Sequence, residues 1–130
     1  MKLRIRGDSI RLRLGRSEVQ RFLRDGEIEE ITHFPKPYVT RFIYALRATP
    51  GDSLINCVFD NYHLTVHVPR EVVQRWATGE EVSIRGTQPI DTAGVSLLKI
   101  LIEKDFECLD GSSEDCQDDA FANPRRVGSV

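Results

Sequence analysis

Hydrophobic and polar residues alternate along the first strands that the sequence predicts. In the stretch KLRIRGDSIRLRL, residues 2–14, Ile and Leu take every second position on both sides of Gly7 and Asp8. This period of two is typical of β-strands, and a Gly-Asp pair between two such runs favours a tight hairpin turn. The apolar face of the predicted hairpin consists of two cross-strand pairs, Leu3 with Leu12 and Ile5 with Ile10.

The polar face of the same hairpin carries like charges. Its cross-strand pairs are Lys2 with Arg13 and Arg4 with Arg11, and Arg6 lies beside the turn. Like charges placed directly opposite each other destabilise a sheet. We therefore expect anions near these five residues, which we call the cationic ladder and treat as candidates for binding an anion or a partner. A partner, a ligand and another part of the chain are the three sources to consider.

Two short segments have the periodicity of helices with one apolar face. Residues 17–25 begin with Ser17, a favoured N-cap, and residues 70–78 follow Pro69, which suits a first helical turn. A glycine follows each segment, as is typical of helix ends. The apolar stripes consist of Val19, Phe22 and Leu23 in the first segment and of Val72, Val73 and Trp76 in the second. We therefore predict two short helices.

Six further runs predict strands: 27–33, 39–48, the two halves of LINCVFDNYHLTVHV (residues 54–68), 81–86 and 95–104. Asp60 and Asn61 favour a two-residue hairpin turn between the two halves. This turn places Phe59 opposite Tyr62, Cys57 opposite Leu64 and Ile55 opposite Val66. The last run, VSLLKILIEK, is apolar at odd and even positions, which predicts a central strand covered on both faces.

The order of predicted elements repeats at an offset of 54 residues, with VQRF at 19–22 corresponding to VQRW at 73–76. Either the chain contains a duplicated unit, or two segments with similar periodicity match by chance. A duplication gives two units of strand, strand, helix, strand, strand over residues 1–48 and 55–104. Two such units predict an α+β fold with a mainly antiparallel sheet or a small barrel, in a single globular domain over residues 1–109.

An acidic, partly ordered tail is predicted over residues 110–130, which have almost no apolar content apart from Phe121. The net charge of −2 hides an uneven distribution. Residues 1–47 carry 11 Lys and Arg against 6 Asp and Glu, whereas residues 103–119 carry 8 Asp and Glu against Lys104 alone. Our first hypothesis is therefore that the tail pairs with the cationic ladder within the chain. The candidate residues of the tail are Glu114, Asp115, Asp118 and Asp119.

Length and composition are those of an ordinary cytoplasmic domain. The chain has 130 residues, is charged from Lys2 onward and contains no apolar run near the roughly 18 residues of a membrane span. Its three cysteines are an odd number, which fits reduced thiols. We expect Cys57 to be a core residue. For Cys108 and Cys116, two ordinary thiols, a disulfide and a metal-binding pair stay open.

Motifs for catalysis or metal binding are weak. His63 and His67 are four positions apart on a predicted strand, which separates them by roughly 13 Å, so they cannot chelate one ion as a pair. No phosphate-binding glycine loop or zinc-hydrolase motif is present. We therefore expect no catalytic residue, metal or cofactor.

Two local resemblances suggest alternative functions. The stretch EIEEI at 27–31 is similar to the Glu-x-Glu-x-Lys strand of tunnel-shaped triphosphatases, with Glu27 and Glu29 in place but Ile31 at the lysine position. This resemblance implies a phosphate-ester or polyphosphate hydrolase. Residues 63–86, with Pro69 before a helix and a Gly-acidic turn after it, resemble the half-barrel of swapped-hairpin (AbrB-like) transcription factors. That resemblance implies nucleic-acid binding, with the cationic ladder contacting phosphates.

Nearly the whole chain resembles a family of small bacterial proteins of unknown function. The resemblance is carried by KLRIRGDSIRLRL at 2–14, EKDFECL at 103–109 and the tail pattern of Glu114, Asp115, Phe121, Asn123 and Pro124, with Ala122 where the family pattern has proline. It implies no activity. The sequence therefore favours a non-catalytic, cytoplasmic binding or interaction domain, and it gives no partner beyond an anion for the cationic ladder.

Overall fold

The computed structural model describes residues 1–35, 40–51, 54–105 and 121, which form eight strands and two helices. The elements are β1 (Lys2–Ile5), β2 (Ser9–Leu14), α1 (Arg16–Asp25), β3 (Glu27–Phe34), β4 (Thr40–Thr49), β5 (Asn56–Asp60), β6 (His63–Pro69), α2 (Arg70–Thr78), β7 (Ser83–Pro89) and β8 (Leu97–Lys104). The predicted α+β class and both predicted helices are confirmed. The predicted strands are all present, with bounds that differ by a few residues.

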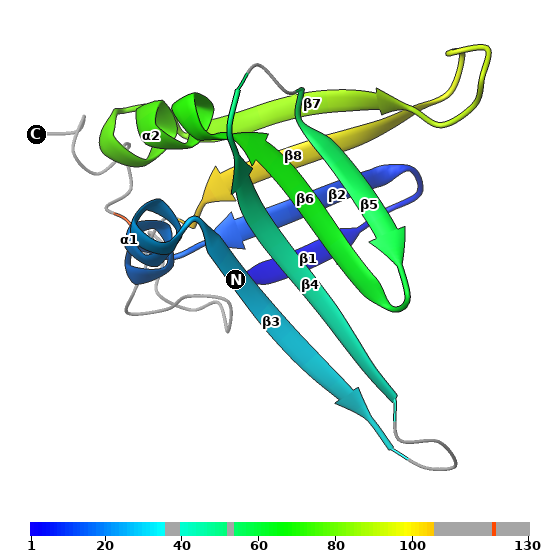
Figure 1. Ribbon diagram of the computed structural model, residues 1–130, viewed down its shortest axis with the longest axis horizontal. Helices are drawn as coiled ribbons and strands as arrows, with labels where there is room; N and C mark the ends of the chain where they lie inside the picture. Colours follow the sequence, from blue (N-terminus) through cyan, green and yellow to red (C-terminus); the bar gives the residue numbers. More distant parts are fainter. Residues whose placement is uncertain (36–39, 52–53, 106–120, 122–130) are drawn as a thin grey trace, which may run out of the picture.

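The strands form two four-stranded sheets, which we call sheet A (order β1-β2-β8-β7) and sheet B (order β3-β4-β6-β5). The outer pairs of each sheet are antiparallel, whereas the central pairs, β2 with β8 and β4 with β6, are parallel. Figure 1 shows that both helices lie at one end of the molecule and that the strands fan out from this end.

The prediction of a mainly antiparallel sheet is confirmed only in part, because four of the six described strand pairings are antiparallel and the two central ones are parallel. The predicted small barrel is wrong, because the two sheets do not close. The helices explain the difference. Each helix carries the chain from one sheet to the other, so a strand before a helix and a strand after it never pair. Both β2 and β8 run toward the helix end, and their pairing is consequently parallel.

The two halves of the chain have the same order of elements, β1-β2-α1-β3-β4 and β5-β6-α2-β7-β8. Each sheet takes two strands from each half. The described structure thus has the order expected of the offset-54 units, while a common origin of the two halves stays a prediction.

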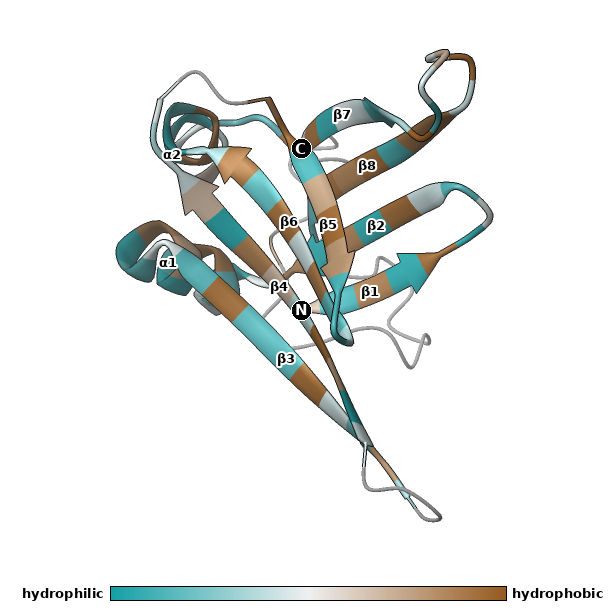
Figure 2. Ribbon diagram, turned by 45° about the vertical axis from the view of Figure 1, so that its right-hand side comes forward, coloured by the Kyte–Doolittle hydropathy of each residue, from teal (hydrophilic) through white to brown (hydrophobic). Residues whose placement is uncertain are grey.

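The core lies between the two sheets and under the helices. Alternate residues of the central strands are buried, and Figure 2 shows the matching alternation of hydrophobic and hydrophilic residues along β2 and β6. The fully buried side chains of these strands are Leu12, Leu14, Val66, Val68, Ile100 and Ile102. Phe22 of α1 and Trp76 of α2 close the helix end, and the Trp76 indole Nε1 donates a hydrogen bond to the Val82 carbonyl at 3.0 Å.

The first hairpin has the predicted register, with Lys2 opposite Arg13 and Arg4 opposite Arg11. The second hairpin is shifted by two residues, because Cys57 lies opposite Val66 and Phe59 opposite Leu64. Its turn is formed by Asn61 and Tyr62, whose φ angles are 49° and 63°. Positive φ at both positions is typical of a type I′ turn, which follows the twist of the strands, and Asn tolerates positive φ well. A shift of two leaves every side chain on its predicted face.

Two smaller predictions also need correction. Helix α1 begins at Arg16, one residue before the predicted bound, and its N-cap is Gly15, two residues before Ser17. The Glu18 carboxylate accepts a hydrogen bond from the Gly15 N–H at 2.9 Å. Strand β8 is central, as predicted, but its outer face is not covered by any described element, since Lys99 on that face is exposed.

Gly86 of β7 packs closely against Ile55, the residue before β5, and this contact requires glycine because a Cβ atom at position 86 would overlap Ile55 Cγ2. We expect Gly86→Ala to lower the free energy of unfolding by about 1–3 kcal/mol through overpacking. Urea unfolding of Gly86→Ala, Ile55→Ala and the double variant measures the coupling. The double variant should lose less than the sum of the single losses, whereas Thr87→Ala on the exposed face should have little effect. Strictly additive losses would contradict this contact.

Candidate anion-binding groove

The outer face of sheet A collects cations from all four of its strands. Arg4 lies opposite Arg11, Arg11 lies opposite Leu101 and Leu101 lies opposite Arg85, so these side chains form one row across β1, β2, β8 and β7. A second row, two residues along, consists of Ser9, Lys99 and Thr87. These positions alternate with the buried residues of the same strands, and their side chains therefore point away from the core.

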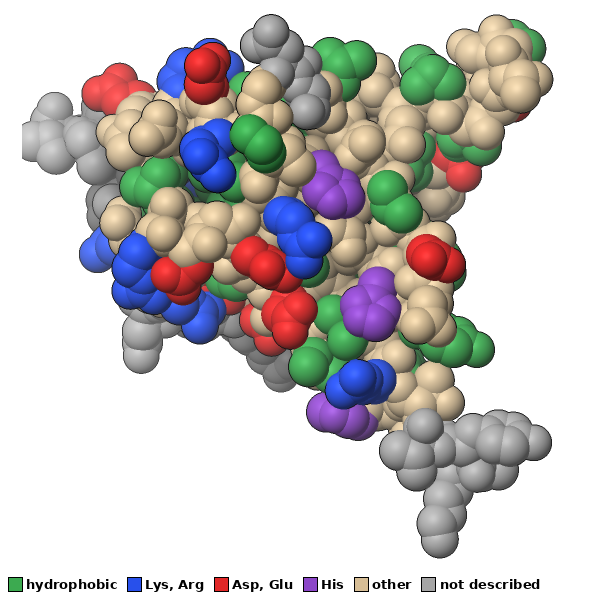
Figure 3. Space-filling view, in the orientation of Figure 1, with side chains coloured by type: hydrophobic (Ala, Val, Ile, Leu, Met, Phe, Trp, Pro, Cys, Tyr) green, Lys and Arg blue, Asp and Glu red, His purple; other side chains and the backbone are tan. Residues whose placement is uncertain are grey.

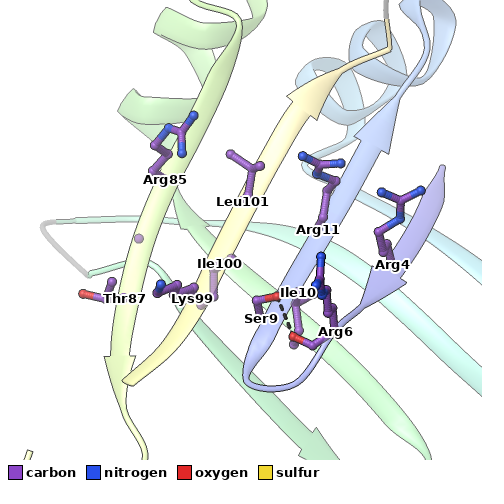
Figure 4. A pocket seen from close by; sticks show the side chains of 11 residues that line it. Arg4, Arg6, Ser9, Ile10, Arg11, Arg85, Thr87, Lys99, Ile100 and Leu101 are labelled. Atoms are coloured by element: carbon purple, nitrogen blue, oxygen red, sulfur yellow. Dashed lines mark hydrogen bonds between the residues drawn. The ribbon is translucent and has the colours of Figure 1, made fainter. Parts of the chain in front are cut away.

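A hollow of about 630 Å³ lies over the two rows and is lined by eleven residues of the described part of the chain (Figure 4). Five of them are cations, namely Arg4, Arg6, Arg11, Arg85 and Lys99, and none is acidic. The other six are Ser9, Ile10, Gly86, Thr87, Ile100 and Leu101. We call this hollow the basic groove. Because Ile10 and Ile100 turn their side chains into the core, they present backbone to the floor of the groove.

The side chains of the first row stand side by side. In Figure 4, Arg4, Arg11 and Arg85 extend in the same direction from three different strands, with Leu101 between Arg11 and Arg85. Arg6 lies beside the hairpin turn, where its carbonyl accepts a hydrogen bond from Ser9 Oγ at 2.7 Å. The positive charges are thus spread across the sheet and do not converge on one point.

One end of the cationic ladder is neutralised by carboxylates of the same chain. Glu103 Oε1 lies 2.6 Å from Arg13 Nε and 3.2 Å from Arg11 Nε, and its side chain is only 16% exposed. Asp105 Oδ2 lies 3.3 Å from Lys2 Nζ. The parallel pairing of β2 with β8 places Glu103 directly opposite Arg13. Here the strain of opposed like charges is relieved within sheet A.

The other end of the ladder has no such neutralisation among the described residues. Arg4 and Arg6 are exposed and form no ion pair with any residue that the structure describes. The same holds for Arg85 and Lys99, which join them in the basic groove. A smaller hollow of about 280 Å³, lined by Lys2, Leu3, Arg4, Arg11 and Arg13, continues this surface along the hairpin.

The sequence predicted the ladder, which supplies three of the five cations of the groove, but not the other two, Arg85 and Lys99. Arg85 and Lys99 alternate with the buried Ile84 and Ile100, so their outward position was readable from the strand pattern. Their place beside Arg11 was not, because it depends on the parallel pairing of β2 with β8. The acidic residues predicted to face the ladder, Glu114, Asp115, Asp118 and Asp119, lie outside the described residues.

The residues of the hydrolase alternative lie on the other sheet. Glu27 and Glu29 are on the outer face of sheet B, where Glu27 Oε1 lies 2.9 Å from Arg47 Nη2. Neither carboxylate faces the basic groove. The tunnel on which that resemblance depends is also missing from the described fold, because the two sheets do not close into a barrel.

The histidines of sheet B have separate local partners. His63 Nδ1 lies 2.9 Å from the Asn61 carbonyl, and His67 Nδ1 lies 3.0 Å from Asn56 Oδ1. Figure 3 shows the histidine side chains standing apart on this face. The described residues contain no group of three or more side chains placed to hold a metal ion. Cys57 is half-buried, and burial raises the pKa of its thiol, while Cys108 and Cys116 lie outside the described residues.

Lys104 is a buried cation whose ammonium group contacts the backbone and an aromatic ring of the protein. Its Nζ donates a hydrogen bond to the Gly79 carbonyl at 3.0 Å and lies 5.9 Å from the centroid of the Trp76 ring. Burial lowers the pKa of this ammonium group. Phe121 packs nearby, with its ring centroid 5.4 Å from Lys104 Nζ and its N–H bonded to the Asp105 carbonyl at 2.7 Å. Within the predicted tail, Phe121 is thus fixed to the end of β8.

The shared carboxylate of Glu103 gives a test of this electrostatic arrangement. Glu103→Gln leaves the adjacent Arg11 and Arg13 without their common anion, and we expect the free energy of unfolding to fall by about 1–3 kcal/mol. The loss should shrink at high salt, because salt screens the repulsion between the arginines. Glu29→Gln on sheet B is the matched control. Equal stability of Glu103→Gln and Glu29→Gln at low salt would show that Glu103 does not neutralise the ladder.

Comparisons with known proteins place the chain in a family. The sequence model of one family matches residues 1–125, and its description is a family of unknown function (DUF7009). No curated protein and no solved structure matches the chain, and no link to swapped-hairpin transcription factors is found. Neither α1 nor α2, the helices of the described chain, has the length and apolar character that a membrane span needs. The match over nearly the full length shows that the chain belongs to the DUF7009 family.

Proposed function

We propose that this chain is a non-catalytic binding domain whose basic groove holds a ligand that carries several phosphate groups. The observation that carries the proposal is the set of exposed cations on one face of sheet A. Arg4, Arg6, Arg85 and Lys99 are drawn from three strands and one turn, and they form no ion pair with any described residue. An external anion bound at this surface would offset the repulsion between the cations.

The residue types favour phosphate over other anions. Four of the five cations in the groove are arginines, whose planar guanidinium groups bind phosphate oxygens through paired hydrogen bonds. Ser9 and Thr87 add hydroxyl groups at the second row. None of the eleven described residues of the lining is acidic, so none of them repels a multiply charged ligand.

The groove lining favours binding over turnover. Among the described residues that line it, hydroxyl groups belong to Ser9 and Thr87 alone, and no histidine, cysteine or carboxylate stands beside them to activate them. Ser9 Oγ already donates its hydrogen bond to the Arg6 carbonyl. The carboxylates of the hydrolase alternative, Glu27 and Glu29, belong to sheet B, so we do not assign them a catalytic role in this groove.

The same proposal includes a competitor within the chain, which is the acidic tail. Glu103 and Asp105, the first acidic residues of the 103–119 segment, already pair with the ladder. The Phe121 N–H donates a hydrogen bond to the Asp105 carbonyl, so this one described residue of the tail lies beside the end of β8. These contacts support the hypothesis that the acidic tail competes with an external ligand, and this hypothesis stays a prediction.

We also infer that the domain acts in the cytoplasm of a bacterium and that its halves arose by duplication. An odd number of cysteines supports a reducing compartment, and the sequence pattern of the family supports a bacterial source. The duplication is supported by the shared order of elements in the two halves. None of these inferences is needed for the groove to bind an anion.

Binding of inorganic tripolyphosphate tests the proposed function. We expect measurable binding by isothermal titration calorimetry at low salt, and about tenfold weaker binding in Arg85→Ala or Lys99→Ala, since each removes a charged hydrogen bond. Arg41→Ala is the control, because Arg41 is an exposed cation on sheet B. Affinities that are equal in all four proteins, or no binding at all, would contradict the proposal.

Removing the negative charges of the tail tests whether the tail competes with the ligand for the basic groove. Replacing Glu114, Asp115, Asp118 and Asp119 together by their amides should tighten tripolyphosphate binding at low salt and have less effect at high salt. This variant is sharper than deletion of residues 110–130, which would also remove the packing of Phe121. Unchanged affinity at low salt would show that the tail does not compete for the groove.

A further inference from the structure

We infer that the ligand of the basic groove is single-stranded nucleic acid, with its sugar-phosphate backbone laid across the strands of sheet A. The inference rests on the proposed function and names the class of ligand. Its first support is the spread of the charges. Arg4 and Arg85 stand at the two ends of a row that crosses all four strands. Three strand spacings separate them, which is roughly 14 Å between their backbones.

A single phosphate ion does not match this spread. A site for one phosphate would turn several donors toward one point, whereas Arg4, Arg11 and Arg85 extend in parallel from separate strands (Figure 4). Lys99, in the second row, lies roughly 7 Å farther along the strand direction. The ligand therefore needs negative charges that are separated from one another. In a nucleic acid strand each phosphate is separated from the next by a sugar, whereas the phosphates of a polyphosphate share bridging oxygens.

An apolar side chain in the middle of the row gives a second support. Leu101 is half-buried and lies between Arg11 and Arg85 in the groove. Together with the aliphatic parts of the neighbouring arginines, it offers contact to a sugar or base, which inorganic polyphosphate lacks. No aromatic residue is among the eleven that line the groove. Stacking of bases must then come from guanidinium planes, so binding should depend little on sequence.

The carboxylates beside the groove limit where the backbone can run. Glu103 belongs to the row of Lys2, Arg13 and Ser83, which lies next to the row of Arg11. The negative charge of Glu103 disfavours phosphates over its own row, so the nucleic acid backbone should run over Arg11 and Lys99. A backbone in this position lies across the outer face of sheet A, which consists of strand side chains. A duplex is usually read by a helix or ribbon that enters one of its grooves, whereas sheet faces and shallow basic grooves suit single strands.

Fluorescence anisotropy with a labelled oligothymidylate of about 12 nucleotides tests the inference on the full chain. Binding should weaken linearly in log-log form as salt rises, with a slope of roughly −2 to −3 for three or four phosphate contacts. Arg4→Gln and Arg85→Gln should each reduce the size of this slope by roughly 0.7, because each removes one contact. Arg41→Gln should leave the slope unchanged. Thermal unfolding of each variant establishes that these exposed substitutions keep the fold.

The remaining outcomes separate this inference from the proposed function. If the protein binds tripolyphosphate but not the oligothymidylate, the nucleic-acid inference is wrong and the proposed function stands. If it binds neither, both are wrong. A duplex of the same length that binds equally well or better would overturn the single-strand inference. Oligothymidylate binding that is insensitive to Arg4→Gln and Arg85→Gln would overturn the placement in the basic groove.

Discussion

The parallel pairing of β2 with β8 is the contact on which both the core and the basic groove depend. It joins a strand from the first half of the chain to one from the second and sets Leu12 beside Ile102 in the core. The same register sets Arg13 beside Glu103 on the outer face. Because side chains alternate between the faces of a sheet, one pairing decides both the packing inside and the charge pattern outside.

The like charges of the first hairpin are resolved in two different ways along one surface. At the helix end, Arg13 and Arg11 share the carboxylate of Glu103. Toward the hairpin turn, Arg4 and Arg6 share the basic groove with two further cations, which belong to β7 and β8. At the helix end, the Glu103 carboxylate offsets the repulsion within the chain. Near the hairpin turn the repulsion between the cations destabilises the surface, and we therefore expect an external anion at this end of the sheet.

Local patterns predicted the elements well, and pairing between distant strands was the part that could not be predicted. The helices at 17–25 and 70–78 follow from apolar periodicity and flanking glycines, and the register of the first hairpin follows from its Gly-Asp turn. The second register failed because Asn61 and Tyr62, with no glycine, form the turn. Three of the five cations of the groove were predicted; Arg85 and Lys99 were not, since they reach it only through contacts between the two halves of the chain.

Backbone amide shifts measured by NMR during a titration with tripolyphosphate test the central claim most directly. The claim is that one groove, built from both halves of the chain on sheet A, receives phosphate groups. The account predicts that the largest shifts fall on Ile10, Gly86 and Ile100, whose backbones lie in the groove. Largest shifts on the outer face of sheet B, around His63 and His67, or shifts confined to the first hairpin, would contradict it.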